Sequence, residues 1–316
     1  MSSHASAAAN LRPLRVSLIT PTFNQAQFVG ATVESVLAQT HTDIEFLVIN
    51  DGSTDETGHV LRGFGDRIRW IDQENQGQAQ TLNRGWTMAT GDLLGYLSSD
   101  DLLRPEAISQ AVATMLAHPE AVACYCDFDL IDSAGRRVRS VQTEDYSKHR
   151  LVRDLVCLPG PGAFFRRRAF EAAGGWNPAL RQVPDFDFWL RLSRHGDFVR
   201  IPKVLADYRV HPESASYRPT TPERADEIIR AVDDFWQADP QDAPEDAAAS
   251  RAMAQLIAAR THFSSGRLGQ GVRRVIRAWL LTPRRSLELL SWRILIGGLL
   301  RRGYYSLRGR IVGSAK

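Results

Sequence analysis

Short apolar runs alternate with helix-spaced apolar positions over the N-terminal third of the chain. Four runs rich in Val, Ile, Leu and Phe predict buried strands, at 16–20, 44–49, 68–71 and 92–97. Apolar residues recurring every three or four positions predict helices between them, over 28–37, around 60–61 and over 77–91. This alternation of strand and helix favours a mainly parallel sheet covered by helices.

The pattern is mixed in the middle of the chain and helical towards its end. Further strands are predicted at 121–131, 163–165 and 199–210, and further helices at 105–118, 166–173 and 185–192. Residues 136–157 are polar and basic, with weak periodicity. Beyond residue 219, long helical stretches are predicted at 222–238, 244–265, 267–281 and 284–301. We therefore expect a disordered N-terminus at 1–13, an α/β domain at 14–218 and a helical, basic extension at 219–316.

The amino-acid composition indicates the class of protein and its cellular compartment. With 316 residues, 43% of them hydrophobic and 24% charged, the chain has the balance of an ordinary globular protein. Its three cysteines lack the paired spacing of a zinc site and are too few for a disulfide scaffold. The sequence shows no signal-peptide pattern and no apolar run long enough to cross a bilayer. These features predict a cytoplasmic protein.

The formal net charge of +3 conceals an uneven distribution. Residues 266–316 carry twelve Lys or Arg and one acid, so they sum to +11 and the preceding 265 residues to −8. An acidic body with a basic tail indicates an anionic partner at the tail, such as a membrane surface or a nucleic acid. The tail lacks a nucleic-acid-binding motif, so we expect no nucleic acid.

Two adjacent carboxylates come shortly after the fourth apolar run. Asp100 and Asp101 come after Ser98 and Ser99, where a buried strand is predicted to end. In open α/β sheets ligands bind just beyond this end of the strands. Two neighbouring carboxylates repel each other unless a positive group lies beside them, and a divalent cation carrying substrate phosphates would serve. The alternative is a solvated turn in which Asp101 caps the next helix.

Two common phosphate-binding devices are missing from the first strand–helix connection. A dinucleotide fold would place Gly-x-Gly-x-x-Gly there, and this chain has Pro21-Thr22-Phe23-Asn24 instead. No P-loop follows any predicted strand. A phosphate would therefore be held by the Asp100–Asp101 pair through a cation.

Over about residues 14–215 the chain resembles family 2 glycosyltransferases of the GT-A fold. The resemblance rests on motifs that occur in the same order at domain-scale spacing. They are VSLITPTFN (16–24), ESVLAQT (34–40), VINDGSTD (48–55), NQG (75–77), NRG (83–85), ATGD (89–92), SDD (99–101), GGW (174–176), DxDxWLxL (185–192) and YRVH (208–211).

The resemblance implies a nucleotide-sugar site at the ends of the first, second and fourth strands. Pro21 and Thr22 would line the base pocket, and Asp51 would accept a hydrogen bond from a base N–H. A purely structural role for Asp51 in shaping its Asp-Gly turn is the alternative. Asp100 would contact the ribose, and Asp101 would ligate the Mg²⁺ or Mn²⁺ ion that bridges the diphosphate.

The resemblance also implies a catalytic base and a further metal ligand. In the family, the Asp of a Glu-Asp pair that opens a helix deprotonates the acceptor hydroxyl, with inversion at the sugar carbon. Here Pro184 precedes Asp185, so Asp185 inherits this role and Asp187 is the fallback. The alternative for Asp185 is helix capping. His211 would complete the metal shell, or would be a structural histidine.

The apolar run 287–300, followed by several arginines, suits a helix lying on an anionic leaflet. The alternative is a helix packed on the catalytic domain. The first interpretation places the protein peripherally on the inner face of the cytoplasmic membrane, with a polyprenyl-linked acceptor.

The function implied is inverting transfer of a sugar, with a UDP-sugar favoured as donor, to a hydroxyl of a glycan or lipid-linked acceptor in bacterial surface polysaccharide synthesis. A non-catalytic nucleotide-binding scaffold is the first alternative. A sugar-nucleotide pyrophosphorylase is the second, although its Gly-rich, basic signature after the first strand is missing.

Overall fold

A computed structural model describes residues 14–211, 220–238, 244–283 and 292–296 of the chain. The chain divides into two compact units. The first comprises residues 1–146, 158–174 and 195–210, and the second comprises 147–157, 175–194 and 211–316. The second unit therefore draws on two segments from within the region predicted as one α/β domain, and the domain limits at 14–218 and 219–316 stay a prediction.

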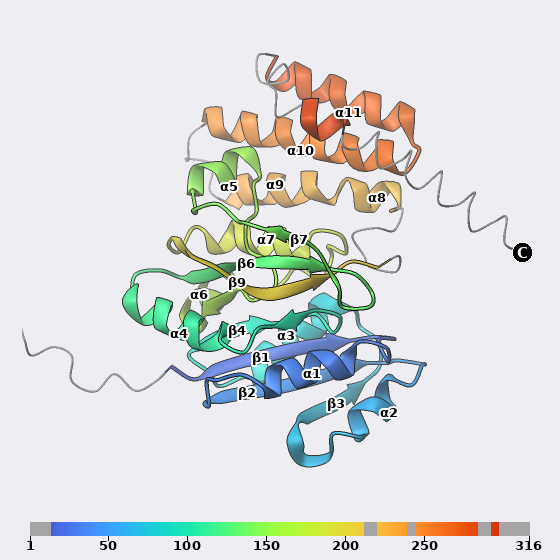
Figure 1. Cartoon of the computed structure of the whole chain (residues 1–316). Helices are drawn as coiled ribbons and strands as arrows, with labels where there is room; N and C mark the ends of the chain where they lie inside the picture. The colour runs from blue at the N-terminus through green and yellow to red at the C-terminus, as the bar shows by residue number, and fades with distance from the viewer. Residues whose placement is uncertain (1–13, 212–219, 239–243, 284–291, 297–316) are drawn as a thin grey trace, which may run out of the picture. The chain divides into compact units, whose positions relative to one another are not determined.

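The first unit holds a nine-stranded sheet in the order β3-β2-β1-β4-β8-β6-β9-β5, with β7 beside β6 (Figure 1). The strands are β1 Val16–Thr22, β2 Ile44–Asp51, β3 Arg69–Gln73, β4 Leu93–Tyr96, β5 Leu102–Leu103, β6 Ala123–Ile131, β7 Arg137–Val141, β8 Phe164–Arg166 and β9 Phe198–Arg209. β1 to β4 are mutually parallel, and β6 and β9 form a second parallel pair. β8 joins the two groups by antiparallel pairing to β4 and β6.

Helices cover both faces of this sheet. They are α1 Val29–Leu37, α2 Thr57–Arg62, α3 Gln78–Met88, α4 Ala107–Ala117 and α6 Arg167–Ala173, with a short 3₁₀ helix at Gly65–Arg67. On one face, Val16 and Leu18 of β1 pack in a core cluster with apolar residues of α1 and α4. On the other face α3 approaches β1 closely, because a Cβ at Gly85 would lie 2.5 Å from the side chain of Ile19. Alternate residues of β1 are therefore buried on opposite sides, as a covered parallel sheet requires.

In the second unit, the regular secondary structure among the described residues is helical. Its helices are α5 Lys148–Asp154, α7 Pro184–Leu192, α8 Pro222–Ala225, α9 Glu227–Ala238, α10 Pro244–Ser264 and α11 Leu268–Leu281. α9 buries Ile228, Ala231, Val232, Phe235 and Trp236, which share one helical face. Within the part of the chain that the structure describes, no helix combines the length and apolarity needed to cross a bilayer.

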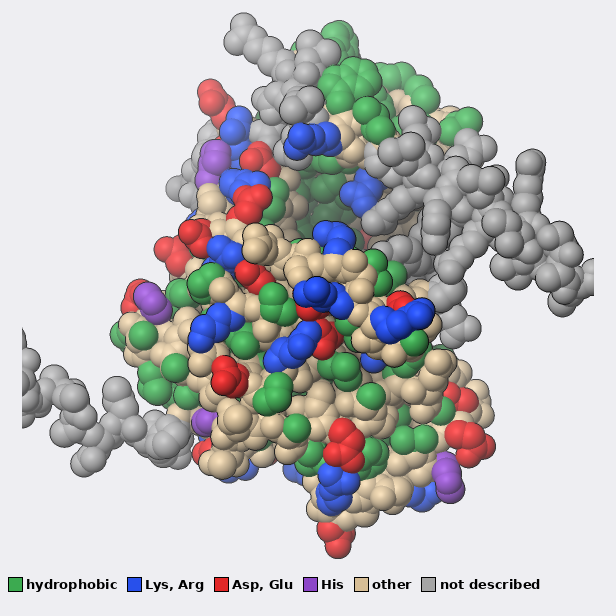
Figure 2. Space-filling model, in the orientation of Figure 1, with side chains coloured by type: hydrophobic (Ala, Val, Ile, Leu, Met, Phe, Trp, Pro, Cys, Tyr) green, Lys and Arg blue, Asp and Glu red, His purple; other side chains and the backbone are tan. Residues whose placement is uncertain are grey.

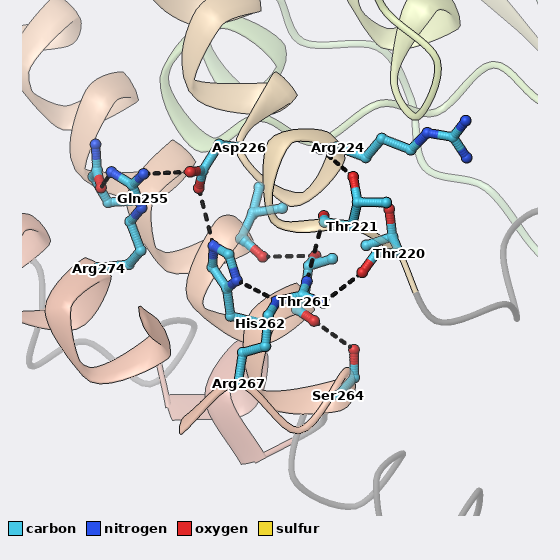
Figure 3. Close-up of polar contacts among 11 residues, drawn as sticks. Thr220, Thr221, Arg224, Asp226, Gln255, Thr261, His262, Ser264, Arg267 and Arg274 are labelled. Carbon is cyan, nitrogen blue, oxygen red and sulfur yellow. Dashed lines mark hydrogen bonds and ion pairs between the residues drawn. The ribbon is translucent and has the colours of Figure 1, made fainter. Parts of the chain in front are cut away.

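His262 lies in a polar network that joins α8, α10 and α11 (Figure 3). Its Nε2 is 3.1 Å from Oδ1 of Asp226, and its Nδ1 accepts a hydrogen bond from Nε of Arg267 at 2.9 Å. Burial lowers the pKa of His262, although Asp226 opposes this effect. Because Nδ1 accepts a hydrogen bond, the ring is neutral and Nε2 donates to Asp226. Arg267 also donates to the Thr220 carbonyl, so the network fastens the α10–α11 turn to the segment that enters α8.

Three local features differ from the sequence prediction. The weakly patterned region 136–157 contains β7 and α5, whose residues are mostly polar. β5, a two-residue strand, pairs with β9 directly after Asp101. The helix predicted over 222–238 is divided at Asp226 into α8 and α9. Of the helix predicted over 284–301, residues 292–296 are helical and the others lie outside the described residues.

Candidate functional site

The carboxyl ends of β2, β1 and β4 form one edge of the sheet. β1 lies between the other two and is parallel to both, and Thr22 aligns with Asn50 of β2. The segment 98–101 leaves the sheet from the same end of β4. Pro21, Thr22, Asp51, Asp100 and Asp101, which were predicted as site residues, are therefore brought to this edge of the first unit.

β1 ends in two buried residues, Pro21 and Thr22. Thr22 is 2% exposed, and its hydroxyl lacks a hydrogen-bond partner among the described residues. Buried hydroxyl groups are usually paired. An unpaired one at the carboxyl edge of the sheet is a candidate donor or acceptor for a ligand.

Asp51 organises the loop that follows β3. Its Oδ1 accepts hydrogen bonds from Nε2 of Gln73 at 2.7 Å and from the backbone N–H of Gln76 at 2.9 Å. Its Oδ2 accepts the backbone N–H of Gly77 at 2.8 Å. Gly77 has φ of 86°, a conformation that glycine adopts without strain. These contacts support the alternative of a structural role for Asp51. A carboxylate oxygen can nevertheless accept a further hydrogen bond from a ligand.

Asp101 is a buried carboxylate with a raised pKa. It is 3% exposed, and its Oδ1 accepts the backbone N–H of Arg209 at 2.8 Å. Burial raises its pKa well above the ordinary value, the adjacent Asp100 raises it further, and Arg209 opposes both effects. A cation beside Asp101 would relieve the cost of its negative charge.

Arg209, which the sequence indicated only as part of the YRVH motif, contacts the acidic segment. It is 5% exposed, and its Nε donates to the Asp100 carbonyl at 2.8 Å. Its Nη1 donates to the Asp132 carbonyl at 3.0 Å, and the guanidinium lies 4.9 Å from the centre of the Phe28 ring. One side chain therefore ties the acidic segment to the β6–β7 turn and to the start of α1.

A second arginine fixes the chain immediately after Asp101. Nη2 of Arg104 lies 3.1 Å from Oδ2 of Asp129 and 2.6 Å from Oδ1 of Asp207, which are neighbours on β6 and β9. The Arg104 backbone N–H also donates to the Leu205 carbonyl at 2.8 Å. Burial raises the pKa of Asp207, and the ion pair with Arg104 opposes this rise. The acidic segment is thus held by hydrogen bonds on both sides.

Asp185 belongs to the second unit, in the first turn of α7. Val183 is the N-cap residue of α7 and Pro184 is its first helical residue. Asp185 is the second helical residue and therefore does not occupy the N-cap position. Burial raises the pKa of Asp185, although the backbone N–H groups of Phe186 and of Asp185 itself lower it. A carboxylate with a raised pKa is suited to accept a proton.

Asp187, the fallback base, is committed to an ion pair. Its Oδ2 accepts hydrogen bonds from Nε and Nη2 of Arg191 at 3.0 and 2.7 Å. Arg191 in turn donates to the Gly175 carbonyl at 2.7 Å. The pair makes Asp187 a support for the loop at Gly175 rather than a free base.

His211 is buried and follows β9 by two residues, within the second unit. Among the residues described here, no group of three or more His, Cys, Asp or Glu side chains is arranged to hold a metal ion. The oxygen donors of Asp100 and Asp101 nevertheless suit Mg²⁺ or Mn²⁺, which commonly take their other ligands from water and substrate phosphates.

Residues 17–174 match the family described as Glycosyl transferase family 2. An uncharacterized glycosyltransferase from Rickettsia prowazekii is 29% identical over 230 residues, which are 70% of each chain. The chondroitin synthase of Escherichia coli is 30% identical over 207 residues, which are 64% of this chain and 30% of that enzyme. The chain thus spans less than a third of this longer relative.

Solved structures share the fold. S. aureus TarS 1–349, in complex with UDP-GlcNAc, has a TM-score of 0.65 at 16% identity, covering 93% of this chain and 92% of that one. The mannosyltransferase PcManGT from Pyrobaculum calidifontis, in complex with GDP-Man and Mn²⁺, has a TM-score of 0.58 at 17% identity, covering 92% and 87%. The chain therefore has the GT-A fold with added C-terminal helices, and it is a glycosyltransferase that belongs to glycosyl transferase family 2.

Proposed function

We propose that this glycosyltransferase moves a sugar from a UDP-sugar to a hydroxyl of a glycan or lipid-linked acceptor, with inversion at the sugar carbon. The acceptor belongs to a bacterial surface polysaccharide. The observation that carries the proposal is the set of acidic side chains gathered where β2, β1 and β4 end. The complex of TarS with UDP-GlcNAc and the relation to a chondroitin synthase support the donor and the acceptor class.

The nucleotide lies across the edge formed by these three strands. Pro21 and Thr22 line the base pocket, and the buried, unpaired hydroxyl of Thr22 supplies a hydrogen bond there. Asp51 accepts a base N–H while it holds the 76–77 turn. Asp100 contacts the ribose, and its backbone is fixed by Arg209.

In this proposal Asp101 and His211 would hold a Mg²⁺ or Mn²⁺ ion. Such an ion would supply positive charge beside the departing diphosphate. The buried Asp101 carboxylate, whose pKa is raised by burial and by Asp100, is suited to a cation. The Mn²⁺ bound beside GDP-Man in PcManGT supports a divalent metal in this fold.

Asp185 removes the proton from the acceptor hydroxyl as it attacks the sugar carbon. Its partly buried position raises its pKa, which makes it a stronger base than an exposed Asp.

The test is Asp185→Asn, assayed for transfer and for UDP binding in the presence of Mn²⁺. We expect transfer to fall by roughly 10²–10⁴-fold, the range for loss of a general base, while UDP binding is retained. NMR of the product would show the inverted anomer. Transfer at the wild-type rate would remove Asp185 as the base, and nucleotide binding without any transfer by the wild type would favour the scaffold alternative.

A thermal-shift screen with UDP, GDP, dTDP and CMP, each with and without Mn²⁺, tests the donor. The proposal expects the largest rise with UDP and Mn²⁺ together. A larger rise with GDP would replace the base assignment without affecting the fold or the acidic site.

The protein acts on the inner face of the cytoplasmic membrane, where a polyprenyl-linked acceptor would be met. The basic composition of residues 266–316 supports an anionic surface as its partner. Most of the apolar run 287–300 lies outside the described residues, and Trp292 and Ile296 within it are each 51% exposed.

A further inference from the structure

α11 packs against α10 through its smallest residues. Gly271 and Ala278, seven positions apart and hence on one face, are the buried residues of this helix. A Cβ at Gly271 would lie 2.4 Å from the ring of Phe263, so the two helices approach as closely as a glycine permits. The packed face of α11 is therefore made of small side chains.

The large apolar side chains of α11 point away from this face. Those that lie along one side of the helix are Leu268, Val272, Ile276, Trp279 and Leu280, with exposed fractions of 46, 51, 53, 50 and 67%. Their spacing of four, four, three and one places them on one continuous stripe. Hydrophobic side chains gather at the top of the view in Figure 2, where Figure 1 places α11. This helix buries glycine and alanine and exposes leucine, isoleucine and tryptophan, so it presents an apolar surface that no other described part of the chain covers.

Arginines flank this stripe, and acids are lacking nearby in the sequence. Arg273 and Arg277 are exposed, and their positions in the helix place them beside Ile276 and Leu280. Arg274 instead turns inward, where it donates to Gln255 at 3.2 Å and pairs with Asp226 (Figure 3). The sequence has no Asp or Glu from residue 247 to residue 287. The exposed side of α11 is thus apolar with a positive rim.

We propose that α11 lies on an anionic lipid surface, with the stripe from Leu268 to Leu280 in the headgroup region and Arg273 and Arg277 on lipid phosphates. Leu, Ile and Trp beside arginines are the composition of interfacial helices. A second copy of the chain fits less well, since a symmetric contact would bring the arginines of both copies together without an acid on α11 to pair with them. The inference concerns membrane contact and does not depend on the transferase activity.

The test compares full-length variants in flotation with phosphatidylcholine vesicles, with and without phosphatidylglycerol. Ile276→Ser/Trp279→Ser removes apolar side chains from the stripe, and Arg273→Glu/Arg277→Glu reverses its rim. The matched controls are Val138→Ser and Arg139→Glu on β7, where both residues are exposed. Circular dichroism and the melting temperature establish that each variant is folded.

We expect the wild type and both controls to float with the phosphatidylglycerol vesicles, and both α11 variants to lose most of that binding. Weaker wild-type binding to pure phosphatidylcholine is also expected, because the arginines need anionic headgroups. If the α11 variants float as well as the wild type, the basic tail alone binds and the proposal is wrong. If the wild type does not float, or if Ile276→Ser/Trp279→Ser converts an oligomer to a monomer in sedimentation, the stripe serves another purpose and the proposal is equally overturned.

Discussion

The Arg209 side chain holds the acidic segment in place by hydrogen bonds. Replacing it with another positively charged residue should therefore separate this positioning effect from the effect of its charge. Arg209→Lys keeps the positive charge but cannot bond the carbonyls of Asp100 and Asp132 together, as the guanidinium does. We expect KM for the donor to rise about tenfold, with a loss of about 1–3 kcal/mol in the free energy of unfolding from the unpaired carbonyls. Steady-state kinetics and urea unfolding measure the two effects. Arg139→Lys, at an exposed site on β7, is the control; a donor KM unchanged in Arg209→Lys would contradict the positioning role.

Asp185 should set the acid limb of the pH–rate profile. The base must be ionised to accept a proton, and burial raises its pKa above the ordinary Asp value of about 3.9. Transfer should therefore fall as pH decreases through this raised pKa, at a higher pH than an exposed Asp would give. The same shift means that ionised Asp185 disfavours the folded state above the unfolded pKa. The profile of kcat against pH measures the limb. Asp185→Glu should retain an acid limb. A wild-type rate that stays flat as the pH is lowered to the ordinary Asp pKa would argue against Asp185 as the base.

At the residue scale, the sequence predicted that three acids lie at the ends of strands, but not what holds them there. Asp51 closes one strand after Asn50, and Asp100 and Asp101 follow another apolar run after two serines, so their place at the ends of strands is a local property. The partners of these acids come from distant segments: Arg209 contacts Asp101 across 108 positions of sequence, and Gly77 reaches Asp51 across 26. Periodicity in a single segment carries no record of such contacts, and here the YRVH motif was the only available signal.

At the scale of elements, the strands and helices with strong periodicity were predicted and the polar ones were missed. α5 has only Leu151 and Val152 buried, and β7 has four exposed residues out of five, so neither shows an apolar repeat. The division of the predicted 222–238 helix at Asp226 was also missed, because Asp226 is oriented by His262 and Arg274 from α10 and α11. These elements are defined by tertiary contacts rather than by their own patterns.

The contact between α10 and α11 predicts opposite effects for two glycines of the same helix. Gly271→Ala gains about 1 kcal/mol of helix propensity, but its methyl group meets the Phe263 ring, and overpacking costs about 1–3 kcal/mol. Gly269→Ala gains the propensity alone, since nothing lies within 4 Å of its Cβ position. We expect melting temperatures in the order Gly269→Ala, wild type, Gly271→Ala, measured by calorimetry. A Gly271→Ala protein as stable as Gly269→Ala would show that α11 does not pack on Phe263.

At the scale of the whole molecule, ligand linkage tests whether Asp101 couples metal to nucleotide. A ligand that binds only the folded state stabilises it by about 2.7 kcal/mol at one hundred times its Kd. UDP with Mn²⁺ should therefore raise the melting temperature more than UDP alone, because an ion bound as proposed would screen the diphosphate from Asp100 and Asp101. In Asp101→Asn the extra rise in melting temperature from Mn²⁺ should disappear. The rise from UDP alone should remain or grow, since one buried negative charge is gone.

Asp66→Asn, at an exposed acid of the 3₁₀ helix, is the matched control and should keep the Mn²⁺-dependent increment in melting temperature. An increment that survives unchanged in Asp101→Asn would place the metal on other ligands and would leave the buried carboxylate with a structural role, as the acceptor of the Arg209 N–H.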